Sequence, residues 1–430
     1  MTLKNRIYSI LGLKDISGAQ INPATSDNQT NGLQKFKISG PVTAFGDLRN
    51  AELSPILQTN FDYTVDNTEI TTNTVTNGGT VTQSESMALC GTSTTTNSTS
   101  LLMSKQTCKY KSGLGGLLRF TSLFSTPVAD TEQYIGLADE EGSSVSFEDG
   151  YMIGYNGVDF GIHRFKDDIQ TTVIQSNFDD PLDGTGVSGI TLDNTKLNAW
   201  EIRYQYLGAG AIELWVESQT TGKFELAHTI QYTNQNTTPS VYNTNFRVVV
   251  FTNNKTTTSD IILKTASFAY FIEGKDVFLI PFQPQQSSGS IQKTTVTTET
   301  ALFTIRSKST YASKTNFIDS VIELLNTSIE ANSANNLGTM RLVRNTTLGG
   351  SPSYSDINTS DSVLEIDIAG TTLTGGQEIL SIELAGKNDR FLHSVLELNI
   401  ILFPTDMITV AVSSANSATF NGSLLLKELF

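Results

Sequence analysis

Apolar and polar residues alternate with a period of two along most of this chain, and that pattern limits the folds open to it. From Trp200 to Tyr206 every second residue is apolar, and the same spacing returns from Ile212 to Val216. Between the two stretches lies the turn-like segment Leu207-Gly208-Ala209-Gly210. Successive side chains of a β-strand point to opposite faces. The segment therefore predicts a hairpin of two strands, each with one apolar face.

Short stretches of the same kind recur along the chain and predict further strands. They are 117–124, 133–137, 151–155, 160–165, 224–231, 246–252, 261–272, 302–307, 321–329, 339–345, 362–368, 379–384, 396–402, 407–412 and 423–428. Turn signals such as Asn77-Gly78-Gly79, Asn156-Gly157 and Asn421-Gly422 separate them. Many short strands with regular turns predict an all-β fold of tandem antiparallel β-sandwiches (jelly rolls).

Shifts in composition predict the domain boundaries. Residues 281–290 combine two prolines with small polar residues and predict a linker. Residues 14–35 are polar and poorly patterned, which is typical of an extended arm ordered against a partner. Residues 3–12 have one apolar helical face and predict a short helix. The expected organisation is an N-terminal arm or attachment region (1–80), a jelly roll (81–280), the linker, and a C-terminal sandwich (291–430).

The charge of the chain excludes several kinds of partner. Its formal net charge is -15, and only 17% of its residues are charged. A negative chain repels phosphate groups, so neither a broad nucleic-acid interface nor an anionic membrane surface is expected as a partner. Apolar runs such as 246–251 are far shorter than the roughly 18 residues of a spanning helix. The N-terminal apolar stretch is too short and polar for a secretory signal, so we expect an unprocessed chain.

Cysteine and histidine are scarce. Cys90 and Cys108 are too few for a disulfide scaffold, a four-cysteine zinc site or an iron–sulfur cluster. Two buried thiols are the default, although a bond across a hairpin stays open. The three histidines, His163, His228 and His393, lie in distant segments. They provide little material for a catalytic triad or a histidine-rich metal centre.

Acidic residues offer two candidate sites. Glu213 and Glu217 share one face of an expected strand, but at about 3.3 Å per residue they lie about 13 Å apart. A glycosidase pair needs about 5 to 9.5 Å, so we expect no catalytic residues and no enzyme. Asp179, Asp180 and Asp183 concentrate oxygen donors on one loop that a calcium ion could use, although an Asx-turn loop without metal explains the same residues. No other cofactor is expected.

Trp215 is the candidate ligand-binding residue. Trp200, Tyr204 and Tyr206 share the alternation expected of core residues. Trp215 instead lies between two apolar positions and shares the polar face with Glu213 and Glu217. A ring on that face could stack on a sugar.

Residues 80–430 resemble virion structural proteins of tailed bacteriophages and large DNA viruses that carry a concanavalin-A/laminin-G-like jelly-roll module. The resemblance in the middle unit is carried by RFTSLF (119–124), YIGL (134–137), DGY (149–151), GYNG (154–157), FGI (160–162), LDGTG (182–186) and YLGAG (206–210). In the C-terminal unit it is carried by LFTIR (302–306), TLGGSP (347–352) and LLLKE (424–428). The resemblance implies a virion component of the fibre, spike or vertex type, located in the virion, and supplies no catalytic residues.

These observations lead to a hypothesis with two alternatives. The chain is expected to be a tail-fibre, spike or head-fibre protein that attaches to a host-surface glycan or protein. Strands rich in Thr, Asn and Ser need neighbours to cover their edges, so copies of the chain, most plausibly a trimer, and other virion proteins are the expected partners. One alternative is a minor capsid, vertex or cement protein without receptor binding. The other is a secreted lectin or carbohydrate-active enzyme.

Overall fold

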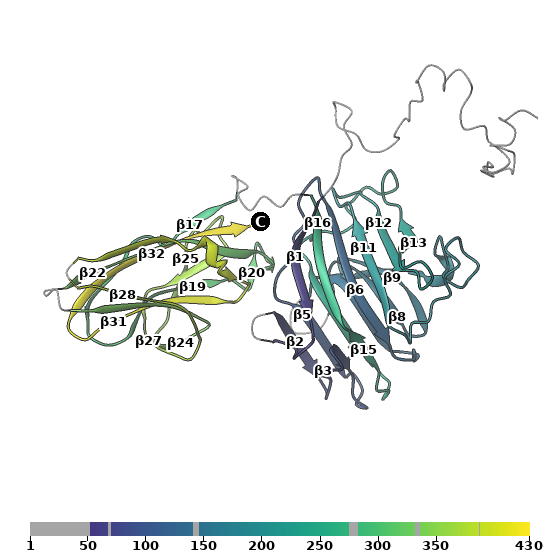
Figure 1. The fold of residues 1–430 in the computed structure, drawn as a ribbon, viewed down its shortest axis with the longest axis horizontal. Coiled ribbons are helices and arrows are strands. Elements are labelled where there is room, and N and C mark those ends of the chain that lie inside the picture. Colours follow the sequence, from purple (N-terminus) through teal and green to yellow (C-terminus); the bar gives the residue numbers. More distant parts are fainter. Residues whose placement is uncertain (1–51, 68–69, 141–145, 275–282, 332–335, 387) are drawn as a thin grey trace, which may run out of the picture. The chain divides into compact units, whose positions relative to one another are not determined.

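The computed structural model describes residues 52–67, 70–140, 146–274, 283–331, 336–386 and 388–430. Antiparallel sheets make up nearly all the regular structure of these residues (Figure 1). The expected all-β fold of tandem sandwiches is therefore confirmed. The helix expected at 3–12 and the polar segment 14–35 lie outside the described residues. Within the described part of the chain, no helix has the length and apolar character needed to cross a membrane.

The first sandwich packs a nine-stranded sheet against a seven-stranded one. In the nine-stranded sheet β6 is flanked by β11, β12 and β13 on one side, and by β15 and β16 on the other; β15 leads to β4 and β3, and β16 to β1. The seven-stranded sheet has the order β10-β9-β8-β7-β14-β5-β2. The elements are β1 (Leu53–Asn60), β2 (Thr71–Thr76), β3 (Thr80–Ser84), β4 (Met87–Gly91), β5 (Thr99–Ser104), β6 (Gly115–Phe124), β7 (Glu132–Ala138), β8 (Gly150–Asn156), β9 (Asp159–Lys166), β10 (Ile169–Ile174), the 3-10 helix η1 (Gln175–Asn177), β11 (Asn198–Tyr204), β12 (Ile212–Glu217), β13 (Phe224–Ile230), β14 (Arg247–Asn253), β15 (Ile262–Thr265) and β16 (Ser267–Glu273).

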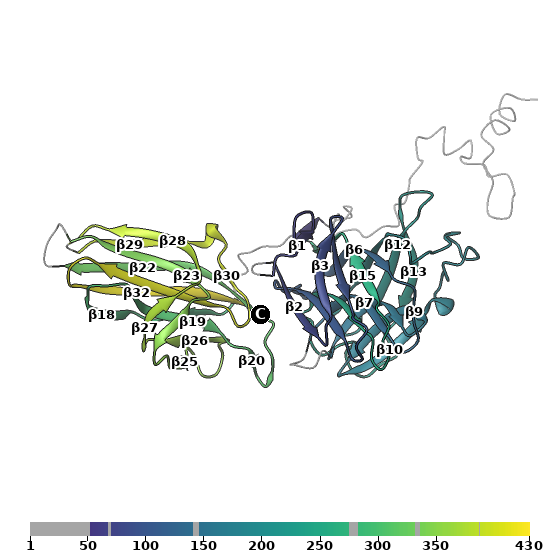
Figure 2. The same ribbon diagram turned by 90° about the horizontal axis from the view of Figure 1, so that it is seen from below.

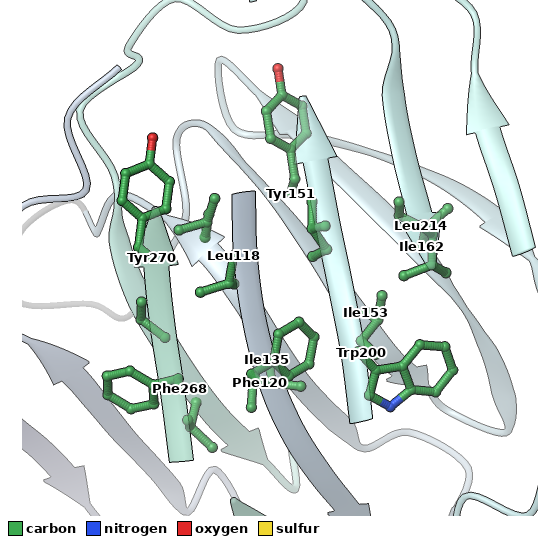
Figure 3. Packing of buried hydrophobic residues seen from close by; sticks show 14 of the residues in the cluster. Leu118, Phe120, Ile135, Tyr151, Ile153, Ile162, Trp200, Leu214, Phe268 and Tyr270 are labelled. Carbon is green, nitrogen blue, oxygen red and sulfur yellow. The ribbon is translucent and has the colours of Figure 1, made fainter. Parts of the chain in front are cut away.

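Alternation along each strand fills the core between these two sheets. On β11, Trp200, Ile202 and Tyr204 are buried in the core, while Glu201 and Arg203 point to the opposite face. Figure 3 shows Trp200 beside Ile153, which comes from β8 of the facing sheet. Phe120, on the neighbouring strand β6 of the same sheet, pairs with Trp200. The hairpin expected at 200–217 is confirmed, because β11 and β12 pair from Trp200↔Val216 to Tyr204↔Ile212.

The seven-stranded sheet is apolar on both faces. Its inward residues, such as Ile135 and Ile153, belong to the main core, while their neighbours Tyr134 and Met152 belong to a second buried cluster with Phe251. Since neighbouring residues of a strand face opposite sides, this cluster covers the outer face of the sheet. The residues of the continuous apolar run at 248–251 therefore lie on both faces of the sheet, and both faces are covered.

The second sandwich has two six-stranded sheets around its own core. One sheet has the order β17-β32-β22-β29, with β18 beside β32 and β30 beside β22 (Figure 2); the other has the order β25-β26-β19-β31-β23-β28. Two short two-stranded sheets, β20–β21 and β24–β27, complete it. The elements are β17 (Gln285–Ser287), β18 (Ile291–Val296), β19 (Thr300–Ser307), β20 (Thr310–Tyr311), β21 (Lys314–Thr315), β22 (Asp319–Ala331), β23 (Gly338–Arg344), β24 (Thr347–Gly350), β25 (Tyr354–Asp356), β26 (Leu364–Asp367), β27 (Gly370–Thr374), β28 (Gln377–Leu384), β29 (Arg390–Ser394), the 3-10 helix η2 (Leu396–Leu398), β30 (Ile401–Leu402), β31 (Met407–Ser414) and β32 (Ala418–Leu429).

Two expected strands differ from the structure. The stretch 261–272 forms two strands, β15 and β16, which break at Ala266, where the backbone N–H groups of Ala266 and Ser267 donate to Thr121 Oγ1. The stretch 396–402 begins with η2 and not with a strand. Asn399 ends that turn with a φ of 48°, a left-handed conformation that an extended strand does not allow.

The strands β1 to β5, between residues 53 and 104, were not expected from the sequence. β1, which pairs with β16, and β2, which pairs with β5, lie within the segment 1–80 that was expected to be an arm. β17 lies within the segment expected to be a linker. Several of these strands carry Thr, Asn and Ser where apolar residues would mark a strand, so hydrophobic alternation alone does not reveal them.

Candidate functional site

The outer face of the nine-stranded sheet gathers polar and aromatic side chains into cross-strand rows. One row follows the successive partners Gln58, Ala269, Arg119, Glu201, Trp215 and Leu226. The next row contains the pairs Asn60↔Ser267, Thr121↔Ala199 and Glu217↔Phe224. Side chains directly opposite each other lie about 4.5–5.5 Å apart. Each row is therefore a continuous strip across β1, β16, β6, β11, β12 and β13 (Figure 1).

A buried carboxylate organises the centre of this face. Glu201 has a fully buried side chain, and its two oxygens pair with different arginines. Arg119 Nε donates to Oε1 at 2.8 Å, and Arg203 Nε donates to Oε2 at 2.8 Å. Charge-assisted bonds of this kind hold both guanidinium groups in fixed positions.

Aromatic rings hold the same two arginines from their other sides. The Arg119 guanidinium carbon lies 5.3 Å from the centre of the Phe224 ring and 5.8 Å from that of Phe271. The Arg203 guanidinium carbon lies 4.1 Å from the Trp215 ring. These cation–π contacts extend the ordered cluster across five strands, β16, β6, β11, β12 and β13.

Trp215 is half-buried on the outer face, whereas Trp200 is fully buried in the core. The Trp215 Nε1–H donates to Glu213 Oε2 at 2.9 Å. Arg203 lies over the ring of Trp215, and Glu213 accepts the hydrogen bond from the indole N–H at the edge of the ring. Two neighbours therefore hold the indole in place.

A hollow of about 640 Å³ lies next to this cluster on the same face, and we call it the Phe224 hollow. Small side chains, those of Ala269, Ala199 and Ser267, lie along the middle of the two rows that cross it. Its lining residues are Gln58, Thr59, Asn60, Ile70, Arg119, Phe120, Thr121, Ala199, Glu217, Phe224, Ser267, Phe268 and Ala269. Small residues between larger ones leave room above the sheet for a ligand that contacts a ring, a cation and side-chain amides at once.

A second hollow of about 310 Å³ adjoins the first, and we call it the Lys196 hollow. Its lining residues are Thr121, Ile190, Thr191, Leu192, Asp193, Lys196, Leu197, Asn198, Ala199, Val216, Glu217 and Gln219. Asp193 accepts bonds from the backbone N–H and the hydroxyl of Thr195, which lower the pKa of its carboxyl. Its carboxylate is therefore held by its own loop.

The aspartates considered for calcium do not converge on one point. The buried Asp180 accepts bonds from the backbone N–H groups of Leu182 and Ser188. Asp183 accepts from Thr185, and Asp179 lies 3.2 Å from His228 Nδ1. Each carboxylate stabilises a different part of the loop, so these residues do not fit a calcium ion. Among the described residues, no group of three or more His, Cys, Asp or Glu side chains could hold a metal.

Cys90 and Cys108 are buried free thiols. Burial raises the pKa of Cys90 to about 12, so its thiol stays protonated. His163 is also buried, and burial lowers the pKa of its ring to about 4. None of the three lines either hollow on the outer face.

Sequence reasoning singled out Trp215, which lines neither hollow, and Glu217, which lines both, but none of the other lining residues discussed above except through their strands. Gln58, Arg119 and Phe224 lie on three different strands, and their proximity depends on strand order. One local signal was available for Arg119. It is a charged residue between Leu118 and Phe120, both core residues, so its side chain must point outward.

Comparisons with known proteins find distant similarity to solved structures that include lectin domains and a putative beta-glucanase from Mycobacterium abscessus. No protein-family model and no curated protein sequence matches the chain. Among solved structures, the carbohydrate recognition domain of Emp47p is 10% identical with a TM-score of 0.32, and the match covers 52% of this chain and 97% of that domain. Lectin II from Ulex europaeus is 12% identical with a TM-score of 0.33, covering 51% and 100%. A legume lectin-like domain from Entamoeba histolytica is 12% identical with a TM-score of 0.32, covering 51% and 98%. The architecture itself rests on the strand pairing described above.

Proposed function

We propose that the chain is a non-enzymatic glycan-binding protein and that the Phe224 hollow is its binding site. The observation that carries the proposal is a hollow with small side chains along its middle, beside a ring and an arginine that Glu201 holds in place. A sugar ring can pack its apolar face on an aromatic side chain while its hydroxyl groups bond to fixed polar groups. The volume of about 640 Å³ lies within the roughly 300–1,000 Å³ usual for ligand sites.

A binding role without catalysis is consistent with the acids on this face. Glu201 is occupied by two arginines, and Glu213 accepts a bond from Trp215. Glu217 lines both hollows, but it lies four positions after Glu213 on β12, a separation of about 13 Å at about 3.3 Å per residue. A glycosidase pair needs its carboxyl groups within about 9.5 Å of each other.

Replacing Phe224 by alanine should weaken glycan binding at least about tenfold, or about 1.4 kcal/mol. The ring is a wall of the hollow and also contacts Arg119. Binding is measured by screening a glycan array with the purified wild-type chain, followed by calorimetric titration of the best glycan with both proteins.

Leu226→Ala is the matched control, because Leu226 lies on the same strand and the same face but lines neither hollow. It should bind as the wild type does. A wild-type chain that binds no glycan on the array, or a Phe224→Ala variant that binds unchanged, would contradict the proposal.

We further propose that this glycan binding belongs to a virion attachment protein, built as a homo-oligomer and most plausibly a trimer. The edge strands β2, β3 and β10 support self-association, because none of them carries a charged residue. Natural edge strands that stay free are commonly protected by charges or proline. A minor capsid, vertex or cement protein would lack receptor binding, and a secreted lectin or carbohydrate-active enzyme would not be located in a virion.

Light scattering of the purified chain should give the mass of an oligomer, and a lysine on the pairing edge should reduce it to the monomer. Thr82→Lys on β3 and Thr171→Lys on β10 test opposite ends of the first sandwich, and both side chains are exposed. A wild-type mass equal to one chain would refute the oligomer. Electron microscopy of a particle labelled with antibodies against the chain tests the virion location.

A further inference from the structure

We infer that the Phe224 hollow and the Lys196 hollow together bind one linear, uncharged polysaccharide along its length, and not a single terminal sugar. This inference rests on the proposed glycan binding and adds the class of ligand. Three observations carry it: the shared lining of the two hollows, the balance of their charges, and the polar side chains that remain without partners at their two ends.

The two hollows adjoin each other on the outer face. Thr121, Ala199 and Glu217 line both of them, so a ligand that lies over these three residues reaches both spaces. Side chains from β1 through β13 line the Phe224 hollow, and five strand spacings of about 4.8 Å give a span of roughly 24 Å. The Lys196 hollow then continues toward the loop that precedes β11. The two hollows together are therefore several times longer than a single sugar ring.

The charges along the two hollows cancel. The lining contains two basic residues, Arg119 and Lys196, and two acidic ones, Glu217 and Asp193. The chain as a whole has a net charge of -15. Arg119 is already paired with Glu201, and the Asp193 carboxylate is held by Thr195. An acidic polysaccharide would need an excess of free cations, which this lining does not provide. A ligand with many hydroxyl groups and no charge matches it.

Unpartnered polar side chains lie toward both ends of the two adjoining hollows. Gln58 on β1 and Gln219 after β12 are exposed, and neither side chain makes a hydrogen bond to any described residue. Lys196 is also exposed, and its charge adds to the Thr195 hydrogen bonds that lower the pKa of the Asp193 carboxyl. The amides can both donate and accept, as sugar hydroxyl groups require. Donors at both ends favour a ligand that reaches from one hollow into the other.

The test is the dependence of affinity on chain length. The wild-type chain is titrated with mono-, di-, tetra- and hexasaccharides of neutral linear glucans, mannans and galactans, and with oligogalacturonates as the acidic probe. For the neutral series that binds, affinity should rise at least about tenfold from the disaccharide to the hexasaccharide. The double variant Lys196→Ala/Gln219→Ala should lose most of that gain while binding the shortest ligands unchanged. Phe224→Ala should weaken every length.

The control variant is Lys223→Ala, an exposed lysine in the β12–β13 turn that lines neither hollow, and it should keep the full length dependence. Equal affinity for all lengths, with Phe224→Ala still weakening them, would overturn the extended site and leave glycan binding intact. Tighter binding of oligogalacturonates than of every neutral series would overturn the uncharged ligand. Absence of binding at every length would refute both this inference and the proposed function.

Discussion

Replacing Trp200 by alanine should cost the first sandwich about 3–5 kcal/mol of unfolding free energy. Trp200 is fully buried between the sheets, where its ring centre lies 5.8 Å from that of Phe160. Phe120 is its partner on β6, and Figure 3 shows Trp200 beside Ile153. A truncated side chain would leave a cavity that these neighbours cannot fill without moving. Urea denaturation followed by far-ultraviolet circular dichroism measures the loss.

A phenylalanine at the same position should cost far less, under about 1.5 kcal/mol. The indole Nε1–H of Trp200 is buried and has no hydrogen-bond partner. A phenyl ring fills part of the space and removes this unpaired donor, so the two effects partly offset each other. Trp215→Ala serves as the matched control, because it is the other of the two tryptophans and lies half-buried on the outer face. Similar losses for Trp200→Ala and Trp215→Ala would contradict the assigned faces of β11 and β12.

The second large effect is expected for Gly154→Ala, at about 3 kcal/mol or more. Gly154 has a φ of +150°, and a Cβ there would lie 1.7 Å from the carbonyl oxygen of Gln133. Because Gly154 pairs with Tyr134 in the centre of the seven-stranded sheet, the clash would separate β7 from β8. The thermal midpoint of unfolding, measured by circular dichroism, should fall steeply.

Gly157→Ala separates this clash from a simple effect of backbone conformation. Gly157 lies in the turn between β8 and β9 with a φ of +66°, and the nearest atom to an added Cβ is 3.8 Å away. The alanine then adds only the strain of a left-handed conformation, which should lower the unfolding free energy by about 1 kcal/mol. Equal stability of the two variants would show that β7 and β8 do not approach as closely as described.

The sequence predicts the strands of the first sandwich from β6 onward, except β10, because alternation is a local signal. In the second sandwich it predicts β19, β22, β23, β26, β28, β31 and β32 but misses the other strands. The strand expected at 321–329 is present as β22, and the hairpin at 200–217 is present as β11 and β12. The signal failed for β2 and β3, where Thr and Asn replace the apolar residues that mark a strand. It also failed at 396–402, where a left-handed Asn399 ends a 3-10 turn.

The calcium hypothesis shows a further limit of reading residue types without their contacts. Three aspartates within five residues were compatible with a calcium site or with an Asx-turn loop without metal. Asp180 accepts from backbone N–H groups of its own loop, Asp183 accepts from the N–H of Thr185 two residues on, and Asp179 lies beside His228. The sequence indicates which oxygen donors are near each other along the chain. Only the loop conformation shows whether their oxygens meet.

By itself the sequence determined the all-β class and the face on which a side chain lies, with Trp200 in the core and Trp215 outside it. Both follow from the two-residue period of a strand, which is a property of neighbouring residues. The tertiary structure decided which distant residues become neighbours. Gln58, Arg119 and Phe224 share a hollow because β1, β16, β6, β11, β12 and β13 lie in that order. Strand order depends on long-range pairing, which no local pattern records.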